Sequence, residues 1–166
     1  MTVDPELLTG LGAAISIFLS STGAAVSSAH AGVFAMRGSS MKDFLPIVIA
    51  GVLAIYGIIV GVLLVGKFNS EITTAQGYRN LSAGLSVGLA CWASGYGMSL
   101  FIKDLNEGGK PKARTGYGGG ENEPLLRNGN GEIPVSHPSF VKLFMCLTFL
   151  EAIGLYGLIV ALFLMG

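Results

Sequence analysis

Charged side chains are scarce in this chain: of its 166 residues, 12% are Asp, Glu, Lys or Arg. A soluble domain usually carries about a quarter of such residues. Long segments of the chain contain almost no charge, and little sequence remains outside them, so we expect no separate soluble catalytic domain. The net charge is zero, and we expect no nucleic-acid partner.

Cysteine is scarce as well, since the chain has only two. Cys91 and Cys146 both lie inside apolar segments, so we expect them to pack as small apolar side chains and not to form a disulfide or a metal pair. The glycines of residues 104–138 neither follow a strand nor precede a helix, so the context of a phosphate-binding loop is missing. We therefore expect no metal and no cofactor.

Hydrophobic residues, in contrast, make up 51% of the chain and concentrate in four segments. A helix needs roughly 20 apolar residues to cross a bilayer. Residues 7–29, 45–66, 81–102 and 140–165 each satisfy this requirement. The sequence predicts an all-α membrane protein with four transmembrane helices.

The second and fourth segments are copies of one another. Residues 50–64 read AGVLAIYGIIVGVLL and residues 150–164 read LEAIGLYGLIVALFL, an offset of 100 that places Tyr56 on Tyr156 and Gly51 on Glu151. The first and third segments correspond at an offset near 70. We therefore expect two tandem helical hairpins, formed by residues 1–66 and 81–166 and joined by a lumenal linker at 67–80. The second hairpin contains the Gly-rich loop 104–138.

Small residues match one another in the first and third segments. The pairs are Ser16 with Ser86, Ser20 with Ala90, Gly23 with Ala93, and Ser27 with Gly97. Steps of three and four put each set on one helix face, and small faces let membrane helices approach closely. Such a stripe is ordinarily a packing face. Because the bulkier even segments lack it, we expect two layers, with the odd helices inside and the even helices outside.

The basic residues are unevenly distributed. Eight of the ten Lys and Arg residues fall on one side if the four helices alternate in direction, and only Lys67 and Arg79 fall on the other. Cytosolic loops carry an excess of Lys and Arg, so the first loop and the third loop, 104–138, are predicted to be cytosolic. Both termini are then lumenal. The composition of the third loop indicates a flexible insertion or a docking segment that a partner orders.

Glu151 is the one acidic residue inside a predicted span, where it lies near the middle of the bilayer. A charged carboxylate there costs several kcal/mol. No Lys, Arg or His lies in any spanning core of the chain, which excludes a buried ion pair within it, and burial favours the protonated form. A carboxyl that stays protonated permanently is the alternative; we favour a functional proton or cation site.

Residues near Glu151 are expected to shape this site. Gly154, one turn away on the same face, lets another surface approach. Tyr56 leans toward the N-terminus of its own helix, so its hydroxyl could reach the height of the carboxyl; simple helix packing is the other role open to it. Val52 and Leu53 are apolar, which argues against a sodium ion that needs several oxygen ligands.

These segments resemble the proteolipid c subunits of eukaryotic vacuolar-type proton ATPases. The resemblance covers nearly all of the four helices. It is strongest in AGVLAIYGIIV at 50–60, LSAGLSVGLA at 81–90 and LEAIGLYGLIVAL at 150–162. It implies a subunit with no ATP hydrolysis site of its own, several copies of which form a rotor ring. In this family the corresponding glutamate carries one proton per step of rotation. Glu151 falls on that position, with Tyr56, Gly51 and Gly154 as supporting residues.

The resemblance also implies location and partners. The location is the membrane of the vacuole or of another acidic organelle. The partners are other proteolipid copies, lipid, central-stalk subunits at the cytosolic loops, and a stationary membrane subunit that brings an arginine to Glu151. The first loop is shorter than the family pattern, the third is longer, and Ser139 stands where a basic residue is usual. These departures affect the expected stalk contacts.

Other classes of membrane protein remain as alternatives. A small four-helix proton-coupled antiporter also has one membrane glutamate, but carries it in the first helix and lacks a parallel hairpin repeat. A purely structural pore or junction protein has no need of an acid at this depth. A sister proteolipid of the same ring places its acid on the other hairpin, whereas Gly51 and Glu151 favour the ordinary c type.

Overall fold

A computed structural model of the chain describes residues 4–37, 41–69, 72–107 and 140–166. Its elements, in chain order, are α1 (Pro5–Arg37), the short 3-10 helix η1 (Met41–Phe44), α2 (Leu45–Gly66), a second 3-10 turn η2 (Lys67–Asn69), α3 (Thr74–Glu107) and α4 (Phe140–Met165). Most of the expected cytosolic loop, from 108 to 138, lies outside the described residues.

The predicted fold class is confirmed. The described residues contain four helices that are long and apolar enough to cross a membrane, and they contain no strand. Helices satisfy every backbone polar group internally, which is what a chain in hydrocarbon requires. The bounds of α2 and α4 are those of the predicted spans, whereas α1 and α3 extend past them. In particular, α3 begins at Thr74, inside the range 67–80 that was expected to be a linker.

Proline marks the beginning of the first two long helices. Pro5 is the first residue of α1, and Pro46 lies in the first turn of α2. Proline fits there because the first N–H groups of a helix have no partner within the helix. The other end of α2 is closed by the backbone N–H of Lys67, which donates to the carbonyls of Leu64 and Val65.

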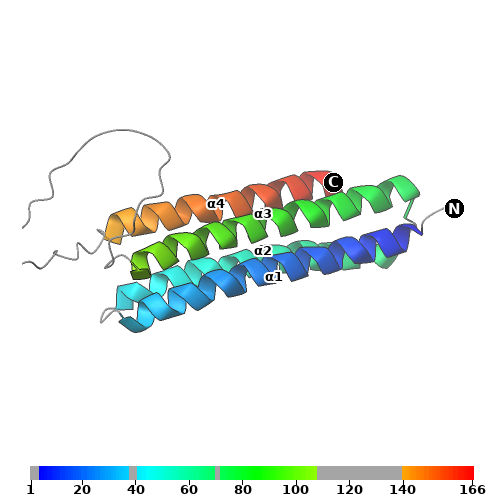
Figure 1. Ribbon diagram of the computed structural model, residues 1–166. Helices are drawn as coiled ribbons and strands as arrows, with labels where there is room; N and C mark the ends of the chain where they lie inside the picture. The colour runs from blue at the N-terminus through cyan, green and yellow to red at the C-terminus, as the bar shows by residue number, and fades with distance from the viewer. Residues whose placement is uncertain (1–3, 38–40, 70–71, 108–139) are drawn as a thin grey trace, which may run out of the picture.

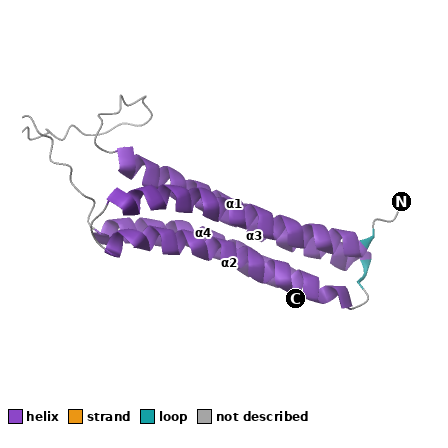
Figure 2. Ribbon diagram, turned by 90° about the horizontal axis from the view of Figure 1, so that it is seen from below, coloured by secondary structure: helices purple, strands orange, loops and turns teal. Residues whose placement is uncertain are grey.

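The helices form the two expected layers. In a side view of the bundle, α1 and α3 lie together on one side and α2 and α4 on the other (Figure 2). The most extensive contact joins α1 to α3, each of which also packs against the next helix of its own hairpin, while α2 and α4 touch less. The N-terminal end of α1 and the C-terminal end of α4 point the same way (Figure 1).

The contact between α1 and α3 depends on glycines that allow the backbones to meet. A Cβ added to Gly23 of α1 would lie 2.7 Å from the carbonyl oxygen of Cys91 and 2.9 Å from Cα of Trp92. A Cβ on Gly95 of α3 would collide with the backbone of Gly23 in turn. Gly12 and Gly84 repeat this crossing eleven residues earlier on both helices. Small residues are the usual means of close approach between membrane helices.

The internal repeat is also visible in the packing. A Cβ on Gly57 of α2 would lie 2.6 Å from the carbonyl oxygen of Ser16 and would collide with Ser20. A Cβ on Gly157 of α4 would lie 3.1 Å from the carbonyl oxygen of Ser86 and would collide with Ala90. The two sets are equivalent at the offsets of 100 and 70 found in the sequence. Both hairpins therefore use the same contact between their own two helices.

The two small-residue stripes differ in their environment. On α1 every member is buried: Ser16, Ser20, Gly23 and Ser27. On α3 the equivalent residues are partly or fully exposed: Ser86, Ala90, Ala93 and Gly97. The α1 stripe faces both α2 and α3, whereas the α3 stripe packs against α4 at Ser86, Ala90 and Gly97. One of two equivalent surfaces is therefore covered within the chain, and the other is not.

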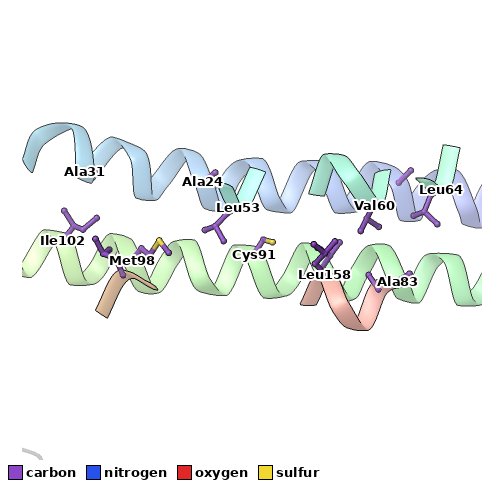
Figure 3. Close-up of a cluster of buried hydrophobic side chains, with 14 of the residues drawn as sticks. Ala24, Ala31, Leu53, Val60, Leu64, Ala83, Cys91, Met98, Ile102 and Leu158 are labelled. Carbon is purple, nitrogen blue, oxygen red and sulfur yellow. The ribbon is translucent and has the colours of Figure 1, made fainter. Parts of the chain in front are cut away.

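Apolar side chains fill the space between the two hairpins. Leu53, Val60 and Leu64 of α2 are completely buried and point toward α3, where Cys91 and Met98 are buried in the same cluster (Figure 3). Close packing of this kind makes the height and rotation of each helix sensitive to single methyl groups. It therefore fixes the relative positions of α2, α3 and α4 at mid-height.

The glycine crossing between α1 and α3 yields the first prediction. Gly23→Ala should destabilise the protein by about 1–3 kcal/mol because the new methyl group meets rigid backbone. Thermal unfolding of the detergent-solubilised protein measures this change. Gly32→Ala is the matched control on the same helix, since its Cβ would meet no atom within 4 Å and alanine favours helix. A Gly23→Ala protein as stable as the Gly32→Ala protein would contradict the close crossing.

Candidate functional site

Glu151 lies near the middle of α4 and is partly exposed at the surface of the four-helix unit. No residue of the surrounding turns is charged: the run FMCLTFLEAIGLYGLIVALFLM carries this single carboxyl. The carboxyl is therefore neither sealed within the bundle nor placed at a helix end, where water would solvate it. Its polar partners must come from neighbouring helices.

The structure brings Tyr56 of α2 to this carboxyl. The Tyr56 hydroxyl donates a hydrogen bond of 2.5 Å to Oε1 of Glu151. Within the described residues this hydroxyl is the one hydrogen-bond partner of the Glu151 side chain. Since Tyr56 is five residues beyond the position equivalent to Glu151, its ring reaches back toward the start of α2, as helical aromatic side chains do.

Gly154 makes room for this approach. A Cβ on Gly154 would lie 2.7 Å from Cδ2 of Leu53 and 3.7 Å from Cδ2 of the Tyr56 ring. Leu53 is completely buried, so it has little space to retreat. Gly154 therefore lets α2 settle close enough to α4 for the Tyr56 ring to pass beside it and reach Glu151.

A third helix contributes a contact that the sequence did not indicate. Ser94 of α3, which is 1% exposed, donates a hydrogen bond of 2.5 Å to the carbonyl oxygen of Leu150. That carbonyl belongs to the peptide group that links Leu150 to Glu151. A serine in an apolar helix usually bonds to its own backbone, so its sequence position alone gave no signal of this contact.

Gly51 is not brought into this group. It lies exposed on α2, and a Cβ built on it would meet no atom within 4 Å. Tyr156, the repeat-equivalent of Tyr56, is 64% exposed on α4. Within the chain, therefore, the tyrosine and acid positions meet once, at Tyr56 and Glu151, and their equivalents Tyr156 and Gly51 both face outward.

Basic side chains are far from the carboxyl along the helices. In the described part of the chain every Lys and Arg lies within about two turns of a helix end. A neutral hydroxyl can donate to an ionised or a protonated carboxyl alike, because the protonated form keeps an acceptor oxygen. The arrangement can therefore hold Glu151 in place through a change of its protonation, but it contains no charge that compensates the ionised form.

Comparison with curated proteins identifies close relatives of the whole chain. It is 34% identical over 160 residues to the human V-type proton ATPase 16 kDa proteolipid subunit c, an alignment that covers 93% of this chain and 88% of the relative. It is 35% identical over 162 residues to the corresponding subunit of Nephrops norvegicus, with 93% and 87% covered. A comparison with protein-family models finds no match.

The chain belongs to the V-type proton ATPase proteolipid family. The family that the sequence resemblance implied is thereby confirmed. Similarity extends equally to relatives named subunit c′: the one from Candida glabrata is 35% identical over 161 residues, covering 92% of this chain and 84% of the relative. Membership in this proteolipid family and the four apolar helices make the chain an integral, multi-pass membrane protein.

The Tyr56 contact yields the second prediction. Tyr56→Phe should speed the reaction of Glu151 with dicyclohexylcarbodiimide about three- to eighteenfold, because the carboxyl loses the hydroxyl that restrains it. Interhelical hydrogen bonds in membranes average about 0.6 kcal/mol, with a maximum of about 1.7 kcal/mol. Mass spectrometry of the labelled protein gives the rate. Tyr156→Phe, the same chemical change at the exposed repeat position, should leave the rate unchanged. Equal effects of the two substitutions would mean that the Tyr56 hydroxyl does not restrain Glu151.

Proposed function

We propose that this chain is a proton-carrying rotor subunit of the membrane sector of a vacuolar-type ATPase, and that Glu151 gains and loses a proton as the ring turns. The observation that carries this proposal is the single mid-helix carboxyl whose described partner is a neutral tyrosine hydroxyl. The names of the relatives, all subunits of proton ATPases, support the same function.

The missing counter-charge defines what a partner has to supply. A carboxyl in an apolar surrounding holds its proton, and a cation within about 4–6 Å favours the ionised form. The described residues place no such cation beside Glu151, so a stationary membrane subunit would bring one. Arginine suits this role because it stays charged when buried. The partial exposure of Glu151 leaves it accessible from outside its own helices.

Orientation follows from the distribution of basic residues. We infer that the end where α1 begins and α4 finishes (Figure 1) is lumenal, because the connections at the other end carry the excess of Lys and Arg. The cytosolic loops, including 104–138, are then the surfaces available to central-stalk subunits. The membrane would be that of the vacuole or another acidic organelle, since ATP-driven proton transport acidifies such compartments.

The third prediction tests the carrier itself. Glu151→Gln should abolish ATP-driven acidification of sealed vesicles while leaving assembly intact, since glutamine keeps the size of the side chain and cannot titrate. Glu6→Gln, an exposed position in the first turn of α1, is the control and should acidify normally. Acidification at the parental rate by a fully assembled Glu151→Gln enzyme would rule out the proposed role.

The uncovered stripe supports assembly of several copies. The small face of α1 is covered by α2 and α3, whereas the equivalent face of α3 is partly exposed. If a second copy placed its first hairpin on that face, the repeat would continue and both stripes would become equally buried. Repeating the same step from copy to copy closes a ring, as heterologous interfaces do when the rotation closes.

The repeat also specifies which residues would meet. The crossings Gly12 with Gly84 and Gly23 with Gly95, moved by the offset of 70, become contacts from α3 of one copy to α1 of the next. The resulting pairs are Ser82 with Ala14 and Ala93 with Ala25 of the next copy. All four residues are small, and all are exposed in the single chain. The positions that the repeat predicts to meet between copies are thus small and exposed, which suits close approach of two helices.

Disulfide trapping of the assembled enzyme is the fourth prediction. In a chain with Cys146→Ser, the pair Ala25→Cys and Ala93→Cys should give a ladder of oligomers on a denaturing gel after mild oxidation. The pair Ala14→Cys and Ala93→Cys should not, since Ala14 and Ala25 lie about 16 Å apart along α1. Monomers alone from the first pair, or equal ladders from both, would refute this interface. The remaining cysteine, Cys91, is buried and is present in both proteins, so it does not account for a difference between them.

A further inference from the structure

The peptide group that carries Glu151 is bonded to a neighbouring helix. The Ser94 hydroxyl of α3 donates to the carbonyl oxygen of Leu150 at 2.5 Å, across the contact between α3 and α4. In an α-helix that carbonyl also accepts the N–H of Gly154, four residues on. The Leu150 side chain also packs closely against α3, since a Cβ built on Gly97 would lie 3.2 Å from its Cδ2.

This use of a serine differs from that of its neighbours. On α3 and α4, the hydroxyls of Ser82, Ser99 and Thr148 all donate to carbonyls of their own helix, three or four residues back. Such bonds satisfy the hydroxyl without joining two helices. Ser94 instead donates 56 residues along the chain, at the turn that bears the carboxyl.

The position of Ser94 on α3 is itself firmly fixed. Its neighbour Gly95 forms a close crossing with Gly23 of α1, and Ser94 is 1% exposed. A continuous path therefore runs from the α1–α3 crossing through Ser94 to the peptide of Glu151, and from the carboxyl to Tyr56 on α2. Rotation of α4 by a fraction of a turn would break the last contact of this path.

We propose that Ser94 is a positioning residue for Glu151: its bond to the Leu150 carbonyl sets the rotation and height of α4 at which the carboxyl meets the Tyr56 hydroxyl. Ser94 touches the backbone and not the carboxyl, so it acts through the Tyr56 contact. In the proposed function, this bond would return the Glu151 carboxyl to the same position after each turn of the ring. The positioning itself does not depend on that function; only its biological role does.

The test compares two serines of one helix in the assembled enzyme. Ser94→Ala should speed dicyclohexylcarbodiimide labelling of Glu151 about threefold, the effect of a typical interhelical hydrogen bond in a membrane. The further effect of Tyr56→Phe should then become small, because the contact that it removes is already weakened. Ser99→Ala removes a hydroxyl of similar burial, 3% exposed, that bonds only to its own helix. In that background the full effect of Tyr56→Phe should remain.

An infrared difference spectrum provides a second readout. The carbonyl stretching band of the protonated Glu151 carboxyl, assigned by its loss in Glu151→Gln, should broaden in Ser94→Ala. Ser94→Thr keeps the hydroxyl and should restore both the band and the labelling rate. If Ser94→Ala fails to assemble, Ser94→Cys, whose thiol is a weak donor, should be labelled faster than the parental protein, by less than about threefold.

Two outcomes would overturn the proposal. One is additivity, in which Tyr56→Phe has its full effect in the Ser94→Ala background. Another is an equal change of the band in Ser99→Ala, which would reduce Ser94 to a packing residue. Neither the labelling rate nor the infrared band depends on proton transport. Normal acidification by Glu151→Gln would therefore refute the proposed function while leaving the result on Ser94 intact.

Discussion

A carboxyl in the middle of a membrane-spanning helix has no water to satisfy it, and the rest of this structure is organised around that constraint. The described chain offers Glu151 one neutral hydroxyl and no cation. Reaching that hydroxyl requires α2, α3 and α4 to converge at one height. Gly154 permits the approach of α2, and the buried Leu53 packs against it. The apolar core thus does more than hold the helices together, because it brings the Tyr56 hydroxyl to the carboxyl.

The internal repeat shows how one scaffold holds two different surfaces. Gly57 and Gly157 pack in equivalent ways against α1 and α3, so the backbones of the hairpins have kept a common geometry. The side chains at the acid position have diverged to Gly51 and Glu151. In the proposed ring, Tyr156 of one copy would face Gly51 of the next, and carboxyl-bearing contacts would alternate with contacts that have none. Each copy would then carry one proton over two hairpins.

Much of the fold was predictable because membrane spans leave a strong signal in sequence. The limits of α2 and α4, the hairpin repeat and the two layers follow from apolar length, self-similarity and small-residue spacing. The extension of α3 back to Thr74 did not, since residues 74–80 are polar and their helical state depends on packing beyond the apolar run. At the site, the lean of Tyr56 followed from helix geometry. Ser94 could not be found this way, because only the rotation of α3 against α4 decides which carbonyl its hydroxyl meets.

In the proposed carrier role the carboxyl leaves its partner once per turn, and the weakness of the Tyr56 contact suits that role. Breaking a buried ion pair by removing one partner costs about 3–5 kcal/mol, whereas an interhelical hydrogen bond between membrane side chains averages about 0.6 kcal/mol. A cation within the chain would therefore hold the carboxylate too firmly for exchange with a passing partner. A tyrosine hydroxyl releases it at small cost, but a weak contact cannot by itself define where the carboxyl returns. That definition has to come from the backbone, and the bond from Ser94 to the Leu150 carbonyl, next to the glycine crossing of α1 and α3, lies where the backbone can supply it.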